Sequence, residues 1–428
     1  MNSFAKTPFW WEDAPLHVSE GVSPPIATNV DVAIVGAGYT GICAALFLAR
    51  GGRSVQVFDR NRPGEGASSR NGGITSGNLR PSHQTLETRF GKARADAVTA
   101  EAVVARQWLY DFIVDEALDV DLQRVGRFSG ALSAKDYDRQ ARSAEAASKI
   151  YGITSFAVSK SELDNYLATD FYVGGTVQMD ISGLHPAKFH AALVQKAVSA
   201  GVLLHGKCRV QSIQKVGEQF RVTTDRGECL AREVIVATNG YTDKSDTWLQ
   251  QRLVPVRSRI IATEPIGQVA VEQLVPRFMM LTDSRELSYY YRPSPDRTRI
   301  LFGGRDRSFV GDPQGPTDHL RHELCRILPQ LSNVGISHSW YGYVAMNRDM
   351  IPRVFNHAGK RYGVGYCGSG VVWAPWVGRK LALKILGHLG SDTGLDFRSP
   401  PWVPNIGGRP WYMPAVLLYK SLKDRGIL

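Results

Sequence analysis

Two short apolar runs enclose a helical pattern near the start of the chain. Residues 30–36 (VDVAIVG) and 54–59 (SVQVFD) are rich in β-branched residues, which is typical of buried parallel strands. Residues 39–50 between them place apolar side chains on one helical face, and Gly51 follows as a helix stop. The order strand, turn, helix, strand predicts a βαβ unit.

The later pattern alternates between helices and strands. Residues 85–118 predict one long amphipathic helix, and residues 185–201 predict another with Pro186 in its first turn. Residues 202–237 predict four strands that return to the first sheet. From Arg252 to about Trp340 the runs are longer and separated by turns, which favours a mostly antiparallel sheet.

The turn of the βαβ unit reads G-x-G-x-x-G. Gly36 permits the tight turn, Gly38 lets the backbone approach a pyrophosphate, and Gly41 lets the helix pack closely on the strand. The start of the helix offers free N–H groups to phosphate. Asp59 ends the second strand, where a carboxylate accepts a hydrogen bond from ribose. This context predicts adenine-dinucleotide binding, and a glycine-rich turn of another α/β protein is the alternative.

A second match to this spacing lies at Gly363, Gly365 and Gly368. Only a helix pattern follows it, at residues 373–389, so it reads as a glycine loop that leads into that helix. We therefore expect one nucleotide domain, rather than the two of an enzyme that holds FAD and NAD(P)H together.

Composition narrows the function classes. The net charge is +11, but the 51 Lys and Arg are scattered, with no long basic run and no zinc-finger spacing, so no nucleic-acid partner is expected. Five cysteines without C-x-x-C spacing support neither a metal site nor a disulfide framework and suggest a reducing, cytoplasmic location. We find no signal peptide and no apolar run of membrane-spanning length.

The loop at residues 61–80 is dense in Gly, Ser and Asn and has no helical or strand period. Small side chains let a backbone approach a ligand closely. Such a loop would run along the dinucleotide beyond the pyrophosphate. FAD, which lies lengthwise in its protein, needs such a loop more than NAD does.

Five segments then resemble the FAD-dependent D-amino-acid oxidase superfamily, which includes glycine and sarcosine oxidases. GASSRNGG at 66–73, with FWWEDAP at 9–15, is most similar to the γ-glutamylputrescine oxidase branch. EVIVATNGYTD at 233–243 resembles the second flavin strand. GISHSWYGYVAMNRDMIPRV at 335–354 and YGVGYCGSGVVWAPWVGRKLA at 362–382 resemble the closing flavin segment.

The resemblance implies an α/β fold: a Rossmann-like FAD-binding domain with a mostly antiparallel α+β substrate domain. The expected FAD-binding domain is discontinuous and comprises residues 28–85, 150–250 and 341–428. Residues 86–149 and 251–340 form the expected substrate domain, and residues 1–27 an N-terminal extension.

The resemblance also implies which residues hold FAD. The glycine turn would bind the pyrophosphate and Asp59 the ribose. The loop from Ser68 would line the pyrophosphate, ribityl chain and flavin edge, Val210 would contact adenine, and Gly368 to Val371 would lie beside the isoalloxazine ring. The full predicted set is Gly36, Ala37, Gly38, Tyr39, Thr40, Gly41, Phe58, Asp59, Arg60, Ala67, Ser68, Ser69, Arg70, Asn71, Gly72, Gly73, Ile74, Val210, Thr238, Asn239, Gly240, Gly368, Ser369, Gly370 and Val371.

The implied reaction is oxidation of the CH–NH bond of an amine or amino acid by hydride transfer to flavin N5. The resulting imine hydrolyses, and the electrons pass to O2 to form H2O2; the alternative acceptor is a quinone. The strand in which some relatives carry a lysine that assists O2 reads RILFGGRD, with no lysine. Positions of covalent attachment carry Arg70 or Asn71 and Ser339 or Trp340 instead of Cys or His, so we expect non-covalent FAD.

No residue is certain to act in the chemistry, because hydride loss from a neutral amine needs only water or a weak base. Arg305 is the first choice to bind a substrate carboxylate, and a surface ion pair is its alternative role. The substrate candidates are Arg305, Tyr291, Tyr290, Trp340, Trp373 and Arg80, with Arg292 and Arg348 as further arginines.

Other features have simpler interpretations. His185 precedes a helix and is expected to cap it, whereas His83 could reach the pocket. The tail at 409–428 is expected to pack on the protein, with a peripheral membrane anchor as the alternative. Two competing functions are a flavin hydroxylase and an accessory flavoprotein subunit. The C-terminal part of the sequence lacks the GDAAH-type motif of flavin hydroxylases.

Overall fold

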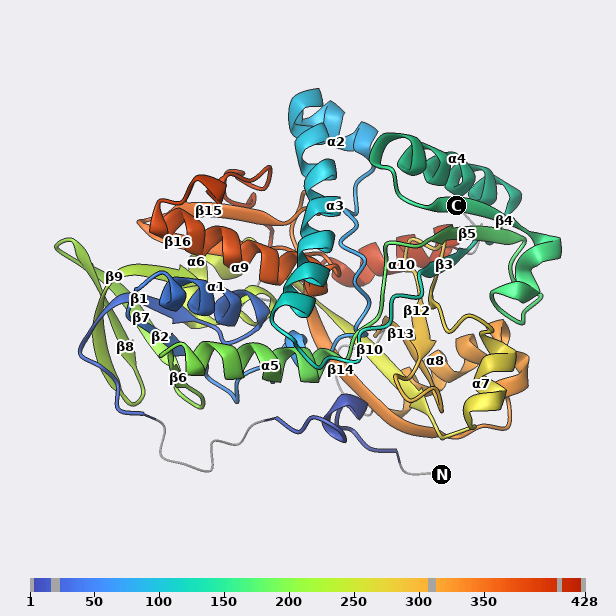
Figure 1. The fold of residues 1–428 in the computed structure, drawn as a ribbon, viewed down its shortest axis with the longest axis horizontal. Helices are drawn as coiled ribbons and strands as arrows, with labels where there is room; N and C mark the ends of the chain where they lie inside the picture. Colours follow the sequence, from blue (N-terminus) through green and yellow to red (C-terminus); the bar gives the residue numbers. More distant parts are fainter. Residues whose placement is uncertain (1–3, 17–23, 307–312, 406–409, 425–428) are drawn as a thin grey trace.

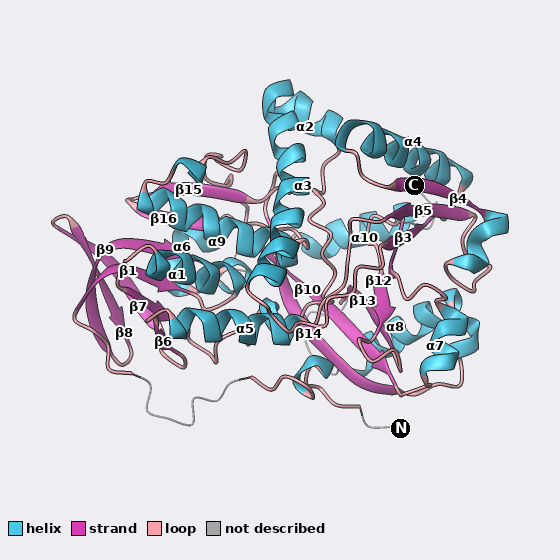
Figure 2. Ribbon diagram, in the orientation of Figure 1, coloured by secondary structure: helices cyan, strands magenta, loops and turns pink. Residues whose placement is uncertain are grey.

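The computed structural model describes residues 4–16, 24–306, 313–405 and 410–424. Within them the chain forms two sheets of eight strands each, one on the left and one on the right of Figure 1. Helices cover both sheets, as Figure 2 shows, and a long helix, α3 (Lys92–Asp115), stands between the two halves.

The first sheet is parallel at its centre, with the strand order β15-β16-β9-β1-β2-β6, and the β7–β8 pair joins it through β9. β1 pairs in parallel with β2 on one side and with β9 on the other. The carboxyl end of β1 is therefore a switch point, where open α/β sheets bind ligands. The bounds are β1 Asn29–Val35, β2 Val55–Phe58, β6 Leu203–His205, β7 Val210–Val216, β8 Gln219–Thr224, β9 Gly227–Val236, β15 Arg353–His357 and β16 Lys360–Val364.

Apolar helices cover one face of this sheet. They are α1 (Tyr39–Arg50), α5 (Pro186–Ser199), α9 (Gly370–Leu386) and α3, and they share one buried core with β1 and β2. A Cβ at Gly378 of α9 would lie 2.4 Å from the carbonyl oxygen of Thr40 in α1, so only glycine lets these two helices meet so closely. The β7–β8 ribbon and α6 (Thr247–Gln250) pack on the other face.

The second sheet has the order β14-β10-β13-β12-β11-β3-β5-β4 and is antiparallel except where β11 pairs with β3. α7 (Gln268–Leu274) and α8 (Gln314–Ile327) cover one face, and α4 (Ala134–Tyr151) packs against β4 and β5. α2 (His83–Phe90) precedes α3, and α10 (Met413–Asp424) ends the described chain. The strands are β3 Arg127–Gly130, β4 Ser155–Ser159, β5 Gly174–Gln178, β10 Val254–Thr263, β11 Met280–Asp283, β12 Tyr290–Pro293, β13 Ile300–Arg305 and β14 Ile336–Met346.

Two sequence-based expectations differ from these elements. β4 and β5 fall in the segment 150–250 that was expected in the FAD-binding domain, but they pair with each other, and β5 pairs with β3 of the second sheet. A short strand carries no local signal for its partner. The single helix predicted at 85–118 is divided into α2 and α3 at Gly91, whose φ of +82° ends the first helix.

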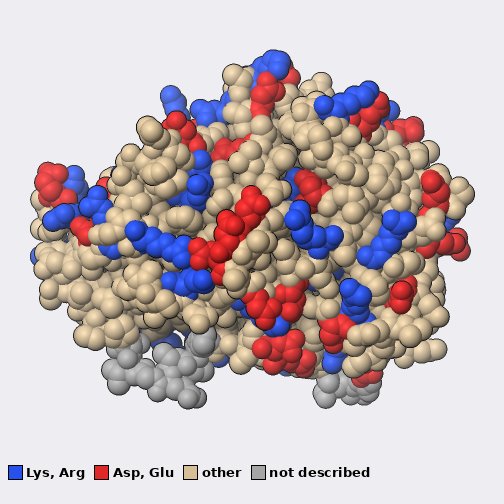
Figure 3. Space-filling model, viewed as in Figure 1, with Lys and Arg blue, Asp and Glu red and all other residues tan. Residues whose placement is uncertain are grey.

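The surface carries both signs of charge. On the face drawn in Figure 3, basic and acidic side chains are interspersed rather than gathered into a single patch. All five cysteines lie in the described part and form no disulfide bond. Among the described helices, none combines the length and the apolar character needed to cross a lipid bilayer.

Candidate active site

An elongated cleft opens at the carboxyl end of β1 and encloses about 1210 Å³ of space between protein atoms, part of it open to solvent. We call it the nucleotide cleft. Its walls are the β1–α1 turn, residues 58–61, the loop at 64–71, residues 237–241 after β9, and the start of α9. These segments are distant in sequence, and the parallel strand pairing brings them to one edge of the sheet.

The glycine turn has the geometry that its motif predicts. Gly36 has φ of +104°, and a Cβ there would lie 2.8 Å from the carbonyl oxygen of Ala237. A Cβ at Gly41 would lie 1.9 Å from the carbonyl oxygen of Gly36. Gly38 precedes α1 and brings no side chain to cap it. Two amides of the turn donate within the protein, Ala37 N to Asp59 and Tyr39 N to Ser68 Oγ. The close contacts at Gly36 and Gly41 exclude larger residues for steric reasons.

Asp59 lies in the same cleft and is held by backbone amides. Its Oδ2 accepts a 2.8 Å hydrogen bond from Ala37 N, and its Oδ1 accepts one of 2.9 Å from Asn61 N. Burial raises the pKa of Asp59, while these two amide donors oppose the rise. Each carboxylate oxygen keeps further acceptor capacity, so a ribose hydroxyl in the cleft can donate to it.

Three indole N–H groups hold the loop at 66–73 from behind. Two come from the 3-10 helix η1 (Phe9–Trp11) in the N-terminal arm and one comes from β14. The aromatic residues near the N-terminus therefore have a structural role, which is to hold the glycine-rich loop in place. The hydrogen bonds are Trp10 Nε1 to Asn71 O at 2.8 Å, Trp11 Nε1 to Ser69 Oγ at 2.9 Å, and Trp340 Nε1 to Arg70 O at 2.9 Å.

A buried guanidinium supports the next residues of the loop. Arg292 Nη1 donates to the carbonyl oxygens of Gly72 and Gly73 at 3.3 Å and of Leu184 at 2.8 Å. Burial lowers the pKa of Arg292 to about 9. The sequence made Arg292 a candidate for binding substrate in the pocket. In the structure its hydrogen bonds instead hold the loop in shape.

A second cavity, which we call the inner pocket, continues from the nucleotide cleft. It encloses about 1480 Å³ and shares Asn71 and Gly368 with the cleft. Strands β10, β12 and β13 of the second sheet supply its far wall, including Ser258, Tyr290 and Arg305. The inner pocket therefore lies between the two sheets.

Five arginines and one acid, Asp283, line the inner pocket; the arginines are Arg70, Arg80, Arg127, Arg285 and Arg305. The guanidinium of Arg305, at the end of β13, makes no ion pair or hydrogen bond with any of the described residues. Arg80 donates from Nε to the carbonyl oxygen of Cys367 at 3.0 Å, and its Nη2 lies beside Gly368. Burial and the neighbouring Arg80 lower the pKa of Arg305 to about 10. Asp283 pairs with Arg285, so Arg80 and Arg305 have no acidic partner among the described residues, and two such charges favour an anionic ligand.

Tyr290 faces this pocket and Tyr291 does not. The Tyr290 hydroxyl lies 2.9 Å from Ser258 Oγ, and its ring packs where Gly303 and Gly72 carry no side chain. The Tyr291 hydroxyl instead lies 3.1 Å from the hydroxyl of Tyr172, on the opposite face of the sheet, where both are buried. Successive strand residues point to opposite faces, so only one of the pair could line the pocket.

Two predicted tryptophans also lie away from the pocket. Trp340 is buried with Trp10 and Phe9 beneath the loop and contributes through its hydrogen bond to Arg70. Trp373 is buried in the core between α9 and its neighbours. Trp340 and Trp373 are therefore removed from the substrate candidates. The sequence pattern predicts the strand and the helix that carry them, but the direction of each side chain depends on tertiary packing.

Most of the predicted cofactor residues line one of the two cavities, and four lie behind them. Ala37, Gly41, Ser69 and Gly73 are buried under the turn and the loop, where they support neighbours that line the cavities. Those on the walls are Gly36, Gly38, Tyr39, Thr40, Phe58, Asp59, Arg60, Ala67, Ser68, Arg70, Asn71, Gly72, Ile74, Val210, Thr238, Asn239, Gly240, Gly368, Ser369, Gly370 and Val371.

Sequence reasoning missed Ser258, Arg127 and Asp283, which line the inner pocket. Ser258 lies between two arginines in β10, and no motif marks it. Burial raises the pKa of Asp283 to about 6. The run Arg257, Ser258 and Arg259 interrupts an apolar strand, and this interruption is the one signal that could have indicated Ser258.

The two histidines behave differently. His185 caps α5, because its Nδ1 accepts a hydrogen bond of 3.1 Å from Lys188 N, as expected. His83 lies at the start of α2 with its Nε2 2.7 Å from Asp96 Oδ1, away from both cavities. A role for His83 in the pocket is therefore not supported.

Comparisons with known proteins agree with this geometry. The family profile described as "DAO: FAD dependent oxidoreductase" matches residues 31–383. The probable oxidoreductase OrdL of Rhizobium meliloti (strain 1021) is 30% identical over 416 residues, which cover 94% of each chain. Gamma-glutamylputrescine oxidoreductase of Escherichia coli (strain K12) is 27% identical over 92% of this chain and 93% of its own. The crystal structure of glycine oxidase from Geobacillus kaustophilus superposes with a TM-score of 0.73 at 19% identity, over 89% of this chain and 100% of that chain.

Proposed function

Because the chain belongs to the DAO family of FAD-dependent oxidoreductases, we propose that it oxidises the CH–NH bond of an amine that carries a carboxylate. Membership makes it an enzyme with FAD as its cofactor and with substrates of the amine or amino-acid type. The proposal adds the bond that is oxidised, the residues that bind cofactor and substrate, and the carboxylate.

The residues of the nucleotide cleft fit FAD. Gly36 and Gly38 leave a turn that a Cβ would fill, and Asp59 retains acceptor capacity beside it. The 66–73 loop and Gly368 connect this cleft with the inner pocket, where an isoalloxazine ring would lie between them. Among the described residues, no cysteine or histidine lines the inner pocket, and Cys367 in the adjoining cleft directs its thiol to the carbonyl oxygen of Gly365. We therefore propose non-covalent binding. When bound, FAD supplies a two-electron acceptor for a hydride.

The paired guanidiniums of Arg305 and Arg80 are the observation that carries the substrate assignment. Arg305 has no acidic partner among the described residues, and the charge of Arg80 further lowers its pKa. A carboxylate between them would relieve the repulsion and form charge-assisted hydrogen bonds. It would also fix one end of the substrate and so orient the C–H bond.

The same charges prepare the amine for oxidation. Arg80, Arg127 and Arg305 line the pocket, and nearby positive charge disfavours an ammonium ion. The amine would therefore bind more readily as the neutral form, whose lone pair assists hydride loss. Tyr290 and Ser258, joined by their hydrogen bond, would form a polar wall that positions it. A dedicated general base is not required by this arrangement.

We propose O2 as the electron acceptor, with H2O2 as the product, and a quinone as the second candidate. β13 carries no lysine toward the pocket, and this observation is the reason for keeping the quinone as the second candidate. Reduction under argon followed by admission of air distinguishes them. Rapid reoxidation with H2O2 release supports the oxidase, and reoxidation only by a quinone analogue supports the dehydrogenase.

The central experiment is anaerobic bleaching of the flavin by a panel of amines and amino acids. At least one carboxylate-bearing amine should bleach it, and Arg305→Met should raise the concentration for half-maximal rate by roughly 100-fold, since a charged hydrogen-bonded pair contributes about 2–3 kcal/mol. Bleaching by uncharged amines alone, or an unchanged concentration dependence in the variant, would refute the carboxylate assignment.

A further inference from the structure

A third cavity, the outer chamber, adjoins the inner pocket. It encloses about 2360 Å³, open solvent included, and shares Arg80, Arg285 and Arg305 with the inner pocket. Its remaining walls come from α2, α4, the end of β14 and α10. A path from solvent to Arg305 therefore runs through this chamber.

The helix α10 forms one side of the outer chamber. Tyr412, Met413, Val416 and Leu417 line the cavity, yet no residue of α10 is buried. A helix without a buried face gains little from apolar packing. Met413 packs against a small apolar cluster that includes Val254 and Met346, and the rest of the helix depends on polar contacts with the body of the protein.

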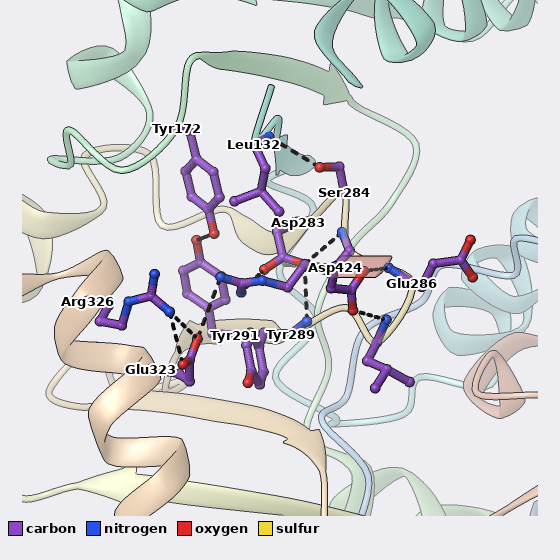
Figure 4. A network of polar contacts seen from close by, with 12 residues as sticks. Leu132, Tyr172, Asp283, Ser284, Glu286, Tyr289, Tyr291, Glu323, Arg326 and Asp424 are labelled. Atoms are coloured by element: carbon purple, nitrogen blue, oxygen red, sulfur yellow. Dashed lines mark hydrogen bonds and ion pairs between the residues drawn. The ribbon is translucent and has the colours of Figure 1, made fainter. Parts of the chain in front are cut away.

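Those contacts converge on the loop that joins β11 to β12, as Figure 4 shows. Asp424 accepts hydrogen bonds from the backbone amides of Glu286 at 2.7 Å and Leu287 at 3.0 Å. Lys420 and Lys423 each donate to the Glu286 carboxylate at 2.9 Å and lower the pKa of Glu286 to about 2. We call these contacts the α10 latch.

The loop held by the latch also forms the wall of the inner pocket. Arg285 donates to Asp283 at 2.6 Å and lies 3.6 Å from Glu323. Arg285 and Asp283 both line the inner pocket. The latch is therefore connected through one short loop to the site where the amine is proposed to react.

The charge of the outer chamber is unbalanced. Eight basic and three acidic residues line it, and two of the acids, Glu286 and Asp424, are used in the latch. The side chains of Arg348, two residues after β14, and of Arg89, in α2, form no hydrogen bond or ion pair with any described residue. The lining cations are Arg80, Arg89, Arg139, Arg285, Arg305, Arg348, Lys420 and Lys423, and the acids are Asp136, Glu286 and Asp424.

We propose that the outer chamber binds a second anionic group of the substrate, at Arg348, and that α10 closes the chamber around this distal part. The inference rests on the proposed function, in which Arg305 and Arg80 bind the first carboxylate. The substrate class is then an elongated amine with two anionic groups, one next to the reacting carbon and one distant from it. Arg348 and α10 are specificity determinants rather than catalytic residues.

Size and charge together support this assignment. A small amino acid bound at Arg305 would leave only water in the outer chamber. The excess positive charge of the chamber would then have no counter-ion from the substrate. Positively charged clefts raise the local concentration of anionic ligands and speed their entry. Pairing with Glu286 leaves the α10 lysines less available to a ligand than Arg348.

The first test measures the binding of non-reactive acids to the FAD-loaded enzyme, through the change in its visible spectrum. The probes are butanoate, the diacids succinate, adipate and suberate, and the monomethyl ester of each diacid. At least one diacid should bind about tenfold more tightly than its own ester. Arg348→Met should remove this difference, whereas Arg53→Met, an exposed arginine outside the cavities, should preserve it.

Equal affinity of every diacid and its ester, or a difference that survives Arg348→Met, would overturn the inference. Failure of the proposed function looks different, because then no carboxylate-bearing amine bleaches the flavin and Arg305→Met changes nothing. If bleaching depends on Arg305 but no diacid binds more tightly than its own ester, the proposed function is supported and the inference about the outer chamber is refuted.

The second test concerns α10. Glu286→Gln should weaken the latch, increase trypsin cleavage after Lys420 or Lys423, and reduce the preference for diacid over ester. Glu145→Gln, which removes an exposed ion pair with Lys149 on α4, is the matched control. Adipate should slow the cleavage in the wild-type protein if α10 closes around the ligand. Cleavage that neither adipate nor Glu286→Gln alters would contradict closure by α10.

Discussion

The indole nitrogen of Trp10 donates a 2.8 Å hydrogen bond to the carbonyl oxygen of Asn71, although 61 residues separate them in the chain. Trp10 is fully buried, and Asn71 lines both the nucleotide cleft and the inner pocket. The N-terminal arm thus supports the cofactor loop from the side opposite the ligand. This relationship leads to the first of four predictions.

Trp10→Phe should weaken FAD binding about tenfold, because it leaves the partly buried carbonyl oxygen of Asn71 without its donor at a cost of about 1–3 kcal/mol. Titration of the apoprotein with FAD, followed by fluorescence quenching, measures the dissociation constant. Trp402→Phe is the control, since Trp402 is 54% exposed. An unchanged FAD affinity in Trp10→Phe would show that the arm does not stabilise the loop.

Gly36→Ala should yield protein with little or no bound flavin. The new Cβ would lie 2.8 Å from the carbonyl oxygen of Ala237, in a backbone conformation with φ of +104°. Gly52→Ala is the control: Gly52 also has a positive φ, of +78°, but open space surrounds it, so its variant has backbone strain without a steric clash. The flavin-to-protein absorbance ratio should fall at least about tenfold in the first variant and remain normal in the second. Normal flavin content in Gly36→Ala would contradict the proposed binding of FAD at the glycine turn.

His185 should make the protein less stable in acid. Burial lowers the pKa of His185 to about 4, below its ordinary value of 6.5. The unfolded chain therefore takes up a proton first, and the stability gained from a neutral His185 is lost as pH falls from 6.5 toward 4. The loss approaches about 3 kcal/mol.

His185→Asn keeps a capping acceptor for α5 but does not titrate, so its stability curve should be flatter across this window. Urea unfolding between pH 4 and pH 7.5 measures the difference. His388→Asn replaces an exposed histidine that caps through Gly390 N and serves as the control. Parallel curves for the wild type and His185→Asn would exclude the proposed linkage.

Tyr290→Phe and Tyr291→Phe should have separate effects. Removal of the Tyr290 hydroxyl, which lies in the pocket wall beside Ser258, should raise KM several-fold with little change in stability. Removal of the Tyr291 hydroxyl breaks its contact with Tyr172 and should cost about 1 kcal/mol of stability without changing KM. Steady-state kinetics and thermal unfolding of both variants give the answer. The reverse pattern would mean that β12 faces the other way.

The βαβ unit and its glycine turn could be predicted because they depend on neighbouring residues. Gly36 and Asp59 follow from backbone requirements within one short segment. The exact direction of Tyr291 could not be predicted, because it depends on which face of β12 meets the core. Trp10 could not be placed either, since its partner lies in a loop that only the tertiary fold brings near.

The sheet membership of β4 and β5 was missed for a related reason. These strands precede α5, which packs on the first sheet, and chain continuity suggested the same domain for both. Their pairing with each other and with β3 is a long-range choice, set by complementary faces rather than by local propensity.

The order of strands in the first sheet has a consequence for synthesis. β1 and β2 leave the ribosome early and β9 follows midway, but β16 and helix α9, which ends at Leu386, are made late. The face of the early βαβ unit that α9 covers must therefore stay exposed until α9 has been translated. Premature termination anywhere before Leu386 should therefore leave fragments that chaperones retain or proteases remove, and the C-terminal third is as necessary for folding as the signature turn at the beginning.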